Sequence, residues 1–184
     1  MSLASEHRFA HRLSEGTLHQ GWMCVVQGRV EEDITTMRQE LTAVRRRAPY
    51  QLAWLAEAYG IAGQTDKGLS TLDEALDLVH QTEERWCEAE LYRLRGELLR
   101  QATGGMQRAA WTPQACFQHA LTIARRQQAK SLELRSAMSL ARLWQQQGKR
   151  TAAHDLLAPV YGWFTEGFDT ADLQEAKTLL EELA

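Results

Sequence analysis

The sequence predicts an all-α protein built from antiparallel helix pairs that repeat along the chain. Three observations predict it. Only three prolines and twelve glycines occur in 184 residues, among many alanines, leucines, glutamines, glutamates and arginines, which lose little side-chain freedom in helices. Apolar residues recur at helical spacing. Finally, one order of large, small and aromatic residues returns along the chain, which is typical of helical repeats.

The clearest repeat unit spans residues 49–82. Its small, apolar and aromatic positions are, in chain order, Leu55, Ala56, Tyr59, Gly63, Gly68, Leu72 and Ala75. The first three lie on one face of a first expected helix, and Gly63 marks the turn to a second. This order resembles the tetratricopeptide pattern, in which small residues let the two helices of a repeat approach closely while large residues fill the grooves.

Three further units follow the same order less regularly. The unit 132–165 repeats it in Leu140, Ala141, Trp144, Gly148, Ala153, Leu157 and Val160. Weaker copies at 14–47 and 88–127 contain Gly21, Cys24, Gly28, Met37 and Glu40, and then Tyr92, Gly96, Leu99, Phe117 and Ala120. The opening small residues, Gly21, Ala56, Gly96 and Ala141, stand 35, 40 and 45 positions apart. This period drifts upward from the usual value of about 34, and the Gly104–Gly105 loop is the expected insertion point.

We therefore predict a single tetratricopeptide-like domain over residues 1–184, an α-solenoid in which helix pairs form a right-handed superhelix. A closing helix is expected over residues 170–183 with Asp169 as its cap, and Thr112 before Pro113 is expected to cap another helix. Asp33 and Glu40 occupy places where the pattern prefers small buried residues. Either the first repeat is distorted or a preceding repeat is missing.

Composition and charge argue against several classes of partner. The net charge of −3 and the pI near 6.1 give no general attraction to phosphate, so nucleic acid is not expected. Three cysteines without a CxxC pair indicate a reducing, cytoplasmic location. No apolar run approaches the roughly 20 residues of a membrane span. The N-terminus lacks a signal pattern and begins abruptly in an expected helix, which predicts a fragment of a larger protein.

Four stretches carry a closer resemblance to a known family. They are LAEAYGIAGQ, EAELYRLRGELL, ACFQHALTIARRQQAKSLELRSAMSLARLWQQQGK and LLAPVYGWFTEGFDTADLQEAKTLLEEL. They resemble the tetratricopeptide C-terminal region of bacterial predicted ATPases, which is often joined to class III adenylate or guanylate cyclase domains or to transcriptional activators. The likeness covers nearly the whole chain, more loosely before Gln51. It implies a parent with an NTP-binding switch domain, but no catalytic position of such a parent has a match here.

No motif in the chain predicts catalysis, a cofactor or a metal. Residues 63–70 come nearest to a phosphate-binding loop but lack its lysine and a preceding strand, so we interpret them as an inter-helix turn. His7 and His11 stand four apart without a third ligand, whereas zinc needs three or four. Cys116 and His119 share a helix face, but catalytic partners usually come from separate segments. We therefore predict that Cys116 packs in the core.

The basic clusters and several aromatic residues receive structural interpretations. Arg45–Arg47, and Arg125–Arg126 with Lys130, are expected near the ends of second helices, where cations complement the helix dipole. Trp144 occupies the aromatic core position of its repeat. A further aromatic group is predicted to hold the last helix in place: Trp163, Phe164 and Phe168.

The repeat register assigns a set of residues to the first-helix face that would line a concave groove. These candidates are His19, Trp22, Tyr50, Trp54, Glu57, Arg93, Glu97, Arg100, Arg135, Arg142 and Gln145. One end is aromatic and the other is rich in arginine, so the groove could hold an extended peptide with apolar anchors and carboxylates. The alternative is that Trp22 and Trp54 pack against a neighbouring helix.

The sequence therefore predicts a non-catalytic protein–protein interaction or regulatory scaffold from a multidomain bacterial signalling protein. Its expected partner is a protein or peptide, which includes other domains of the parent chain, and homodimerisation through a terminal repeat is a further expectation. A small-molecule-sensing superhelical domain is the alternative function, and an enzyme is a third. Neither nucleic acid nor a membrane is an expected partner.

Overall fold

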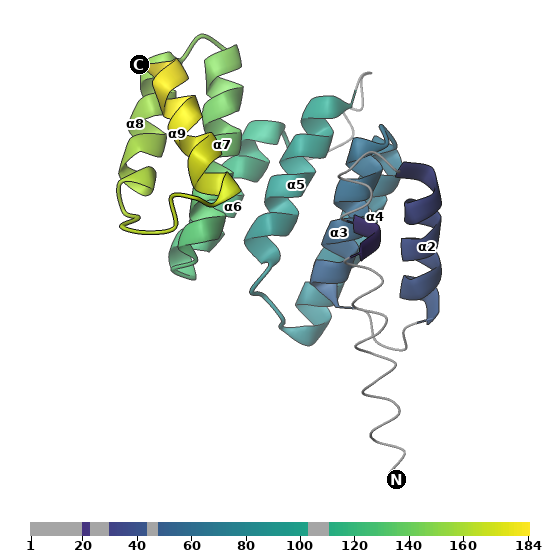
Figure 1. The fold of residues 1–184 in the computed structure, drawn as a ribbon. Helices are drawn as coiled ribbons and strands as arrows, with labels where there is room; N and C mark the ends of the chain where they lie inside the picture. The colour runs from purple at the N-terminus through teal and green to yellow at the C-terminus, as the bar shows by residue number, and fades with distance from the viewer. Residues whose placement is uncertain (1–19, 23–29, 44–47, 103–110) are drawn as a thin grey trace. The chain divides into compact units, whose positions relative to one another are not determined.

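The computed structural model describes residues 20–22, 30–43, 48–102 and 111–184, which are mostly helical and contain no strand within these ranges (Figure 1). The expected all-α class is confirmed. The described residues form two compact units. The first contains those up to Arg85 together with 101–102, and the second contains 86–100 and those from 111 onward. The helices are α2 (Val30–Ala43), α3 (Pro49–Ile61), α4 (Thr65–Thr82), α5 (Glu88–Gln101), α6 (Pro113–Arg126), α7 (Lys130–Gln146), α8 (Arg150–Tyr161) and α9 (Ala171–Leu183).

In the first unit, α3 and α4 form a helix pair that turns at Gly63. The φ angle of Gly63 is 70°, a left-handed conformation that glycine adopts at little steric cost. The amide of Gln64 donates to the carbonyl of Tyr59 at 2.8 Å, and the amide of Gly63 donates to that of Gly60 at 3.1 Å. These bonds satisfy carbonyls at the end of α3. The turn that Gly63 predicted in the sequence is thus present in the structure.

The core of the first unit lies between the facing sides of its helices. Ala56 of α3 and Ala75 of α4, the small positions of the repeat, are both fully buried, so no larger side chain holds the two helices apart. Helix α2 packs on α3. The buried apolar side chains of α2, α3 and α4 are Ile34, Met37, Leu41, Leu52, Ala53, Leu55, Ala56, Ala58, Tyr59, Leu72, Ala75, Leu76 and Val79.

In the second unit, α5 and α6 meet at a glycine. A Cβ atom added to Gly96 would lie 2.4 Å from Cε1 of Phe117 and under 3 Å from two more ring atoms. Phe117 is fully buried in the core of α6–α9, so its ring has little freedom to retreat. Close helix approach, and not backbone conformation, therefore requires glycine at position 96.

The α7–α8 turn repeats the geometry of the α3–α4 turn. Gly148 has a φ of 76°, and the amide of Lys149 donates to the carbonyl of Trp144 at 2.9 Å. The α6–α7 turn closes in the same way without a glycine, because Gln128 takes the left-handed position with a φ of 55°. Left-handed backbone is strained for a residue with a Cβ. No residue pattern in the sequence predicted this second kind of turn.

Helix α9 packs on α7 and α8 and buries one stripe of its surface: Leu173, Ala176, Leu179 and Leu183. Its remaining face is mostly polar and exposed, which suits a terminal element of a repeat stack. The cap preceding α9 is Thr170 and not Asp169, so that expectation is wrong; the Thr170 hydroxyl donates to the carbonyl of Gly167 at 2.7 Å. The expected cap at Thr112 is confirmed, because its hydroxyl accepts from the amide of Ala115 at 3.1 Å.

Several expectations stay predictions. The single domain, the four repeat ranges and the right-handed superhelix are not settled by the helix bounds. Cys24, Gly28 and the Gly104–Gly105 insertion point lie outside the described residues. Among the helices that are described, none combines the length and apolar character that crossing a membrane requires.

Candidate functional site

Four of the predicted groove residues come together in the first unit. The Trp22 and Trp54 rings are stacked, with centroids 6.4 Å apart and an interplanar angle of 28°. Tyr50 meets Trp54 edge-on at 5.2 Å and 81°. The indole N–H of Trp22 donates to Oε2 of Glu57 at 2.7 Å. We call Trp22, Tyr50, Trp54 and Glu57 the aromatic–acid cluster; all four side chains are half-buried.

The predicted groove residues of α5 and α7 form ion pairs in the second unit. Arg93, which is 8% exposed, donates to both carboxylate oxygens of Glu90, at 2.9 and 2.7 Å. Arg135 of α7 reaches the same carboxylate at 3.0 Å. Such forked, charge-assisted bonds fix the side chains firmly. Arg93 is therefore committed to a carboxylate of its own helix, and the Arg135–Glu90 pair joins α5 to α7.

A second pair lies further along α5. Arg100 donates to Oε2 of Glu97 from both Nε and Nη2, at 3.1 and 3.0 Å. The two residues are three positions apart on one helix, where side chains are neighbours. Both predicted candidates thus contact each other, which lowers the excess positive charge that the sequence suggested for this end.

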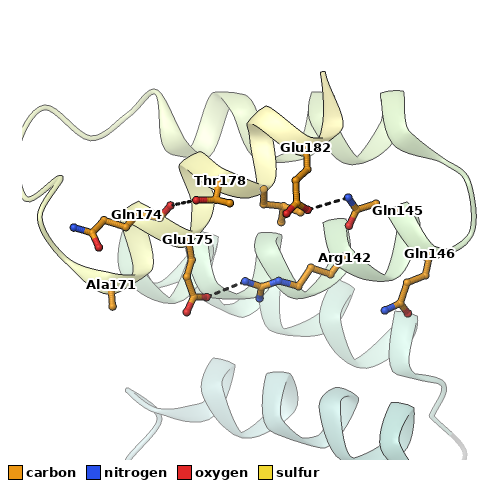
Figure 2. A pocket seen from close by; sticks show the side chains of 9 residues that line it. Arg142, Gln145, Gln146, Ala171, Gln174, Glu175, Thr178 and Glu182 are labelled. Carbon is orange, nitrogen blue, oxygen red and sulfur yellow. Dashed lines mark hydrogen bonds and ion pairs between the residues drawn. The ribbon is translucent and has the colours of Figure 1, made fainter.

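The last two candidates, Arg142 and Gln145, line an open cavity of about 540 Å³ between α7 and α9 (Figure 2). We call it the α7–α9 groove. Seven of its nine lining residues are polar or charged. They are Arg142, Gln145, Gln146, Gln174, Glu175, Thr178 and Glu182, with Ala171 and Leu179 as the apolar members.

In this groove, carboxylates of α9 accept hydrogen bonds from some of the donor groups of α7. Arg142 binds Oε2 of Glu175 at 2.8 Å, and Gln145 donates to Oε2 of Glu182 at 3.2 Å (Figure 2). Arg150 of α8 donates to the main-chain carbonyl of Glu182. All three contacts are exposed, so water competes with them.

The α9 half of the groove was not among the sequence candidates. Gln174, Glu175, Thr178 and Glu182 follow each other at helical spacing on α9 and line the groove together with the buried Leu179. This polar stripe was visible in the sequence. Its position beside α7 was not, because the repeat register assigns no groove positions to a closing helix.

Another ion-pair network joins the end of α6 to the start of α7. The buried carboxylate of Glu133 accepts from Nε of Arg125 at 2.9 Å and from Nζ of Lys130 at 2.8 Å. Burial alone would raise the pKa of Glu133, but the hydrogen bonds and charges of Lys130 and Arg125 outweigh it and lower this pKa. Arg125 lies in the last turn of α6 as predicted. Lys130 begins α7, so its predicted place near a helix end that favours cations is wrong.

Cys116 has the chemistry of a core residue. Its side chain is fully buried, and burial raises the pKa of its thiol to about 11. A thiol that stays protonated at neutral pH is a poor nucleophile. The centroid of the His119 ring lies 4.4 Å from that of the Tyr92 ring and 5.1 Å from that of the Trp111 ring.

The aromatic residues after α8 differ from expectation. Trp163 is 57% exposed and Phe168 is 46% exposed, so neither holds the last helix by burial, and that interpretation is wrong for both. Phe164 does pack against the core, as does Trp144. Trp163 instead lies under the ammonium of Lys130, 5.4 Å from its ring centroid, an arrangement of the cation–π type.

The remaining candidates have simple outcomes. Residues 63–70 form the α3–α4 turn and the start of α4, where Lys67 donates to Oε1 of Gln64 at 2.8 Å. Within the described ranges, no three His, Cys, Asp or Glu side chains are grouped to hold a metal ion. His7, His11, His19 and Arg45–Arg47 lie outside those ranges.

Comparison with known structures defines the class of fold as tetratricopeptide-repeat-like, as predicted. The chain is similar to the crystal structure of nearly identical TPR-like repeats of a presumed kinesin light chain from Podosopora anserina, with 19% identity and a TM-score of 0.61, covering 100% of this chain and 87% of that one. A single-substitution variant of those repeats matches with 17% identity and a TM-score of 0.57, covering 100% and 95%. No protein-family model and no curated protein matches the chain.

Proposed function

We propose that this chain is a non-catalytic protein-interaction scaffold that binds an extended peptide segment of its partner in the α7–α9 groove. The amide lining of the groove carries the proposal. Gln145, Gln146 and Gln174 each combine an NH₂ donor with a carbonyl acceptor. An extended peptide backbone presents donors and acceptors in alternation, so it can satisfy such a lining without any particular side chain.

The ion pair in the groove adds a means of recognising charge. The Arg142 side chain is 43% exposed and that of Glu175 is 60% exposed. Exposed ion pairs of this kind contribute only about 0–1 kcal/mol to stability. A carboxylate of the partner can therefore replace Glu175 at Arg142 at small cost, and the forked guanidinium would bind it in a defined orientation.

The test is to select peptides against the full chain from a random phage-displayed library and to measure their affinity by calorimetry. We expect the double substitution Gln145→Ala with Gln174→Ala to weaken binding about tenfold, because two bonds of roughly 0.5–1.5 kcal/mol each are lost. Lys177→Ala, on the exposed surface of α9 outside the groove, is the matched control and should change nothing. Selected peptides that bind the double variant as tightly as the unsubstituted chain would contradict the proposal.

A small-molecule sensor is the second candidate, and the volume of the groove favours it. About 540 Å³ lies within the roughly 300–1,000 Å³ of small-molecule sites. The linings of those sites are mostly hydrophobic and aromatic residues, however, whereas seven of the nine lining residues here are polar or charged. A thermal-shift screen of polar metabolites separates the two functions, since a ligand that binds the folded state raises its melting temperature. An enzyme has weaker support, because the buried thiol of Cys116 stays protonated at neutral pH.

We also propose that the scaffold belongs to a larger cytoplasmic signalling protein of bacterial origin, whose other domains are candidate partners. The sequence resemblance described above supports this parent. Reading the complete gene tests it: an NTP-binding domain on the same chain is expected, and a gene that encodes only these residues would contradict it.

Self-association is a further proposal, and the polar exposed face of α9 favours the N-terminal repeat as its site. A terminal repeat whose apolar surface is covered by polar side chains gains little from stacking. Light scattering at rising protein concentration should therefore show a dimer that a change on the polar face of α9, such as Glu181→Ala, leaves intact. A monomer at all concentrations would count against dimerisation.

A further inference from the structure

Another cavity in the second unit, of about 290 Å³, lies where the end of α6, the start of α7 and the second half of α8 meet. Its volume is close to the lower end of the range for small-molecule sites, roughly 300–1,000 Å³, so it suits a compact ligand. It shares no lining residue with the α7–α9 groove. We call it the Trp163 cavity, because Trp163 forms its apolar part together with three residues of α8: Leu156, Pro159 and Val160.

The Trp163 ring offers a surface for an aromatic ligand. Its centroid lies 5.2 Å from that of the Phe164 ring and 5.4 Å from Nζ of Lys130, and the residue is still 57% exposed. A ligand ring packed on Trp163 would remove apolar surface of both rings from water. It could also take the offset or edge-to-face arrangement that aromatic pairs prefer. An aromatic group is therefore favoured over a small aliphatic one.

Arg125 and Lys130 place positive charge at the edge of this cavity. Both bind the buried Glu133 carboxylate, Arg125 through Nε alone and Lys130 through Nζ. Within the described ranges, the four terminal N–H donors of the Arg125 guanidinium make no hydrogen bond, and the side chain is exposed. The guanidinium can therefore bind a ligand carboxylate with a forked pair of hydrogen bonds and keep its bond to Glu133.

The balance of charge in the lining favours an anion at this edge. One lining carboxylate is Glu133, whose two oxygens already accept from Arg125 and Lys130. The other is Asp155, which lies 3.7 Å from Nδ1 of His154. Asp155 is exposed, so water screens its charge. The two cations therefore exceed the one buried carboxylate that they share.

We propose that the Trp163 cavity binds a small aromatic carboxylate, whose ring packs on Trp163 and whose carboxylate pairs with Arg125 and Lys130. The ammonium of Lys130 lies 5.4 Å from the centroid of the Trp163 ring, so a short linker of a few carbon atoms joins the two parts of the ligand. Arylalkanoates have this chemistry. The site adds small-molecule recognition to the proposed scaffold and does not depend on the α7–α9 groove.

The experiment is a titration of the full chain with 3-(4-fluorophenyl)propanoate, followed through the ¹⁹F resonance of the ligand. Two compounds compete with it: the corresponding non-fluorinated amide keeps the ring and loses the charge, and propanoate keeps the charge and loses the ring. We expect the acid to bind saturably with a Kd of about 1 mM or tighter, and each competitor to bind about tenfold more weakly. The indole N–H resonance of Trp163 in ¹H–¹⁵N spectra, assigned with Trp163→Phe, should shift and so locate the site.

Two substitutions separate the charge from the ring contact. Arg125→Gln should weaken binding of the acid about fivefold and leave the amide unchanged. Arg126→Gln is the matched control, because Arg126 lies in the same last turn of α6 and does not line the cavity. Trp163→Leu should weaken both compounds about tenfold, whereas Trp86→Leu, at an exposed tryptophan outside the cavity, should change nothing. Circular dichroism verifies folding; Arg125→Lys, which keeps a charge for Glu133 and removes the fork, replaces Arg125→Gln if that variant is unfolded.

Each other outcome overturns the proposal in a defined way. Equal binding of the acid and the amide would make the cavity a pocket for apolar groups. Equal binding of the acid and propanoate would make it a site for anions in general. Tighter binding of a capped peptide that ends in phenylalanine with a free carboxylate would assign the cavity to the end of a partner chain. Absence of binding by every compound, with a folded chain, would leave the cavity without a ligand of this class.

Failure of this site and failure of the α7–α9 groove appear in different measurements. Gln145→Ala with Gln174→Ala should leave binding of the acid unchanged, because neither residue lines the Trp163 cavity. Binding of the display-selected peptides should likewise be insensitive to Trp163→Leu.

Discussion

The first-helix residues of the two compact units hold different chemistry at equivalent positions of the repeat. In the first unit, Trp22, Tyr50 and Trp54 gather around a single carboxylate, Glu57. In the second unit, guanidinium groups bind carboxylates of the same chain, as at Arg142. The repeat register assigned all of these positions to one groove-lining face, and that assignment stays a prediction. The sequence predicted an aromatic end and an arginine-rich end, but it did not predict that the arginines would bind carboxylates of the same chain.

The repeat pattern thus predicts where a side chain lies along the chain of helices. The residues that surround this side chain determine the net charge of that part of the surface. The sequence placed Arg93 in the groove as one of its cations. In the structure it donates to Glu90, which also binds Arg135. The positive end inferred from the sequence is therefore nearly balanced. Under the proposed function, recognition there requires a partner carboxylate to replace an internal one.

The largest expected effect breaks the close packing that is specific to the second unit. Gly96→Ala places a Cβ 2.4 Å from the buried ring of Phe117, and overpacking of this kind costs about 2–3 kcal/mol. Urea unfolding followed by circular dichroism measures the loss. The indole N–H resonance of Trp22, in the first unit, should stay where it is in ¹H–¹⁵N spectra, because the change lies in the other unit.

The same substitution can be repaired within the second unit. Phe117→Leu shortens the ring that the new Cβ meets, so the double variant should lose at least about 1 kcal/mol less than the sum of the single losses. Additive losses would show that Gly96 matters for a reason other than contact with Phe117.

The next effect concerns the Glu133 network of the second unit. Glu133→Gln should destabilise the chain by about 1–2 kcal/mol, because Arg125 and Lys130 lose a shared carboxylate. Because the folded pKa of Glu133 lies below its ordinary value of 4.5, its stabilising effect is full above that value. It should disappear as the pH falls through the lowered pKa. Unfolding of both proteins between about pH 7 and pH 3 should therefore show the two stabilities converging; a constant difference would contradict it.

A smaller effect tests what the two units share. Gly63 and Gly148 both have positive φ angles and open space around the Cβ position. Replacing either with alanine should cost about 1 kcal/mol from backbone strain alone. The reverse change, Gln128→Gly, removes the strain of a left-handed backbone conformation at a residue with a Cβ. It should not lower the free energy of unfolding. Unequal losses at Gly63 and Gly148 would show that the two turns are not equivalent.

The smallest expected effect tests whether a partner can replace the ion pair in the α7–α9 groove. Arg142→Ala breaks an exposed pair with Glu175 and should change the free energy of unfolding by less than about 0.5 kcal/mol. The free energy of binding of acidic peptides should become less favourable by more than this amount. A stability loss well above this value would mean that the pair is structural and unavailable to a partner.

The sequence predicted most of the helical framework because its signals are local. The Gly63 and Gly148 turns, the Thr112 cap and the small residues Ala56 and Ala75 all appear in their expected roles. Each of these features depends on a few consecutive residues, so the order of residue types is enough to indicate it.

The site was predicted less well because its partners come from distant elements. Glu175 reaches Arg142 across 33 positions, and Glu182 reaches Gln145 across 37, which no repeat register indicates. Trp163 was expected to hold the last helix in place, but the loop after α8 leaves it exposed beside Lys130. Side-chain exposure in a connecting loop depends on the path of the loop, and residue type alone does not reveal it.

We propose that the chain binds an extended peptide segment of its partner in the α7–α9 groove. The most direct measurement is a map of ¹H–¹⁵N chemical shifts in the full chain on addition of a display-selected peptide. We predict that the largest changes occur at the side-chain amides of Gln145, Gln146 and Gln174. Changes confined to α4, α6 and the outer side of α8, with these amides unmoved, would contradict it.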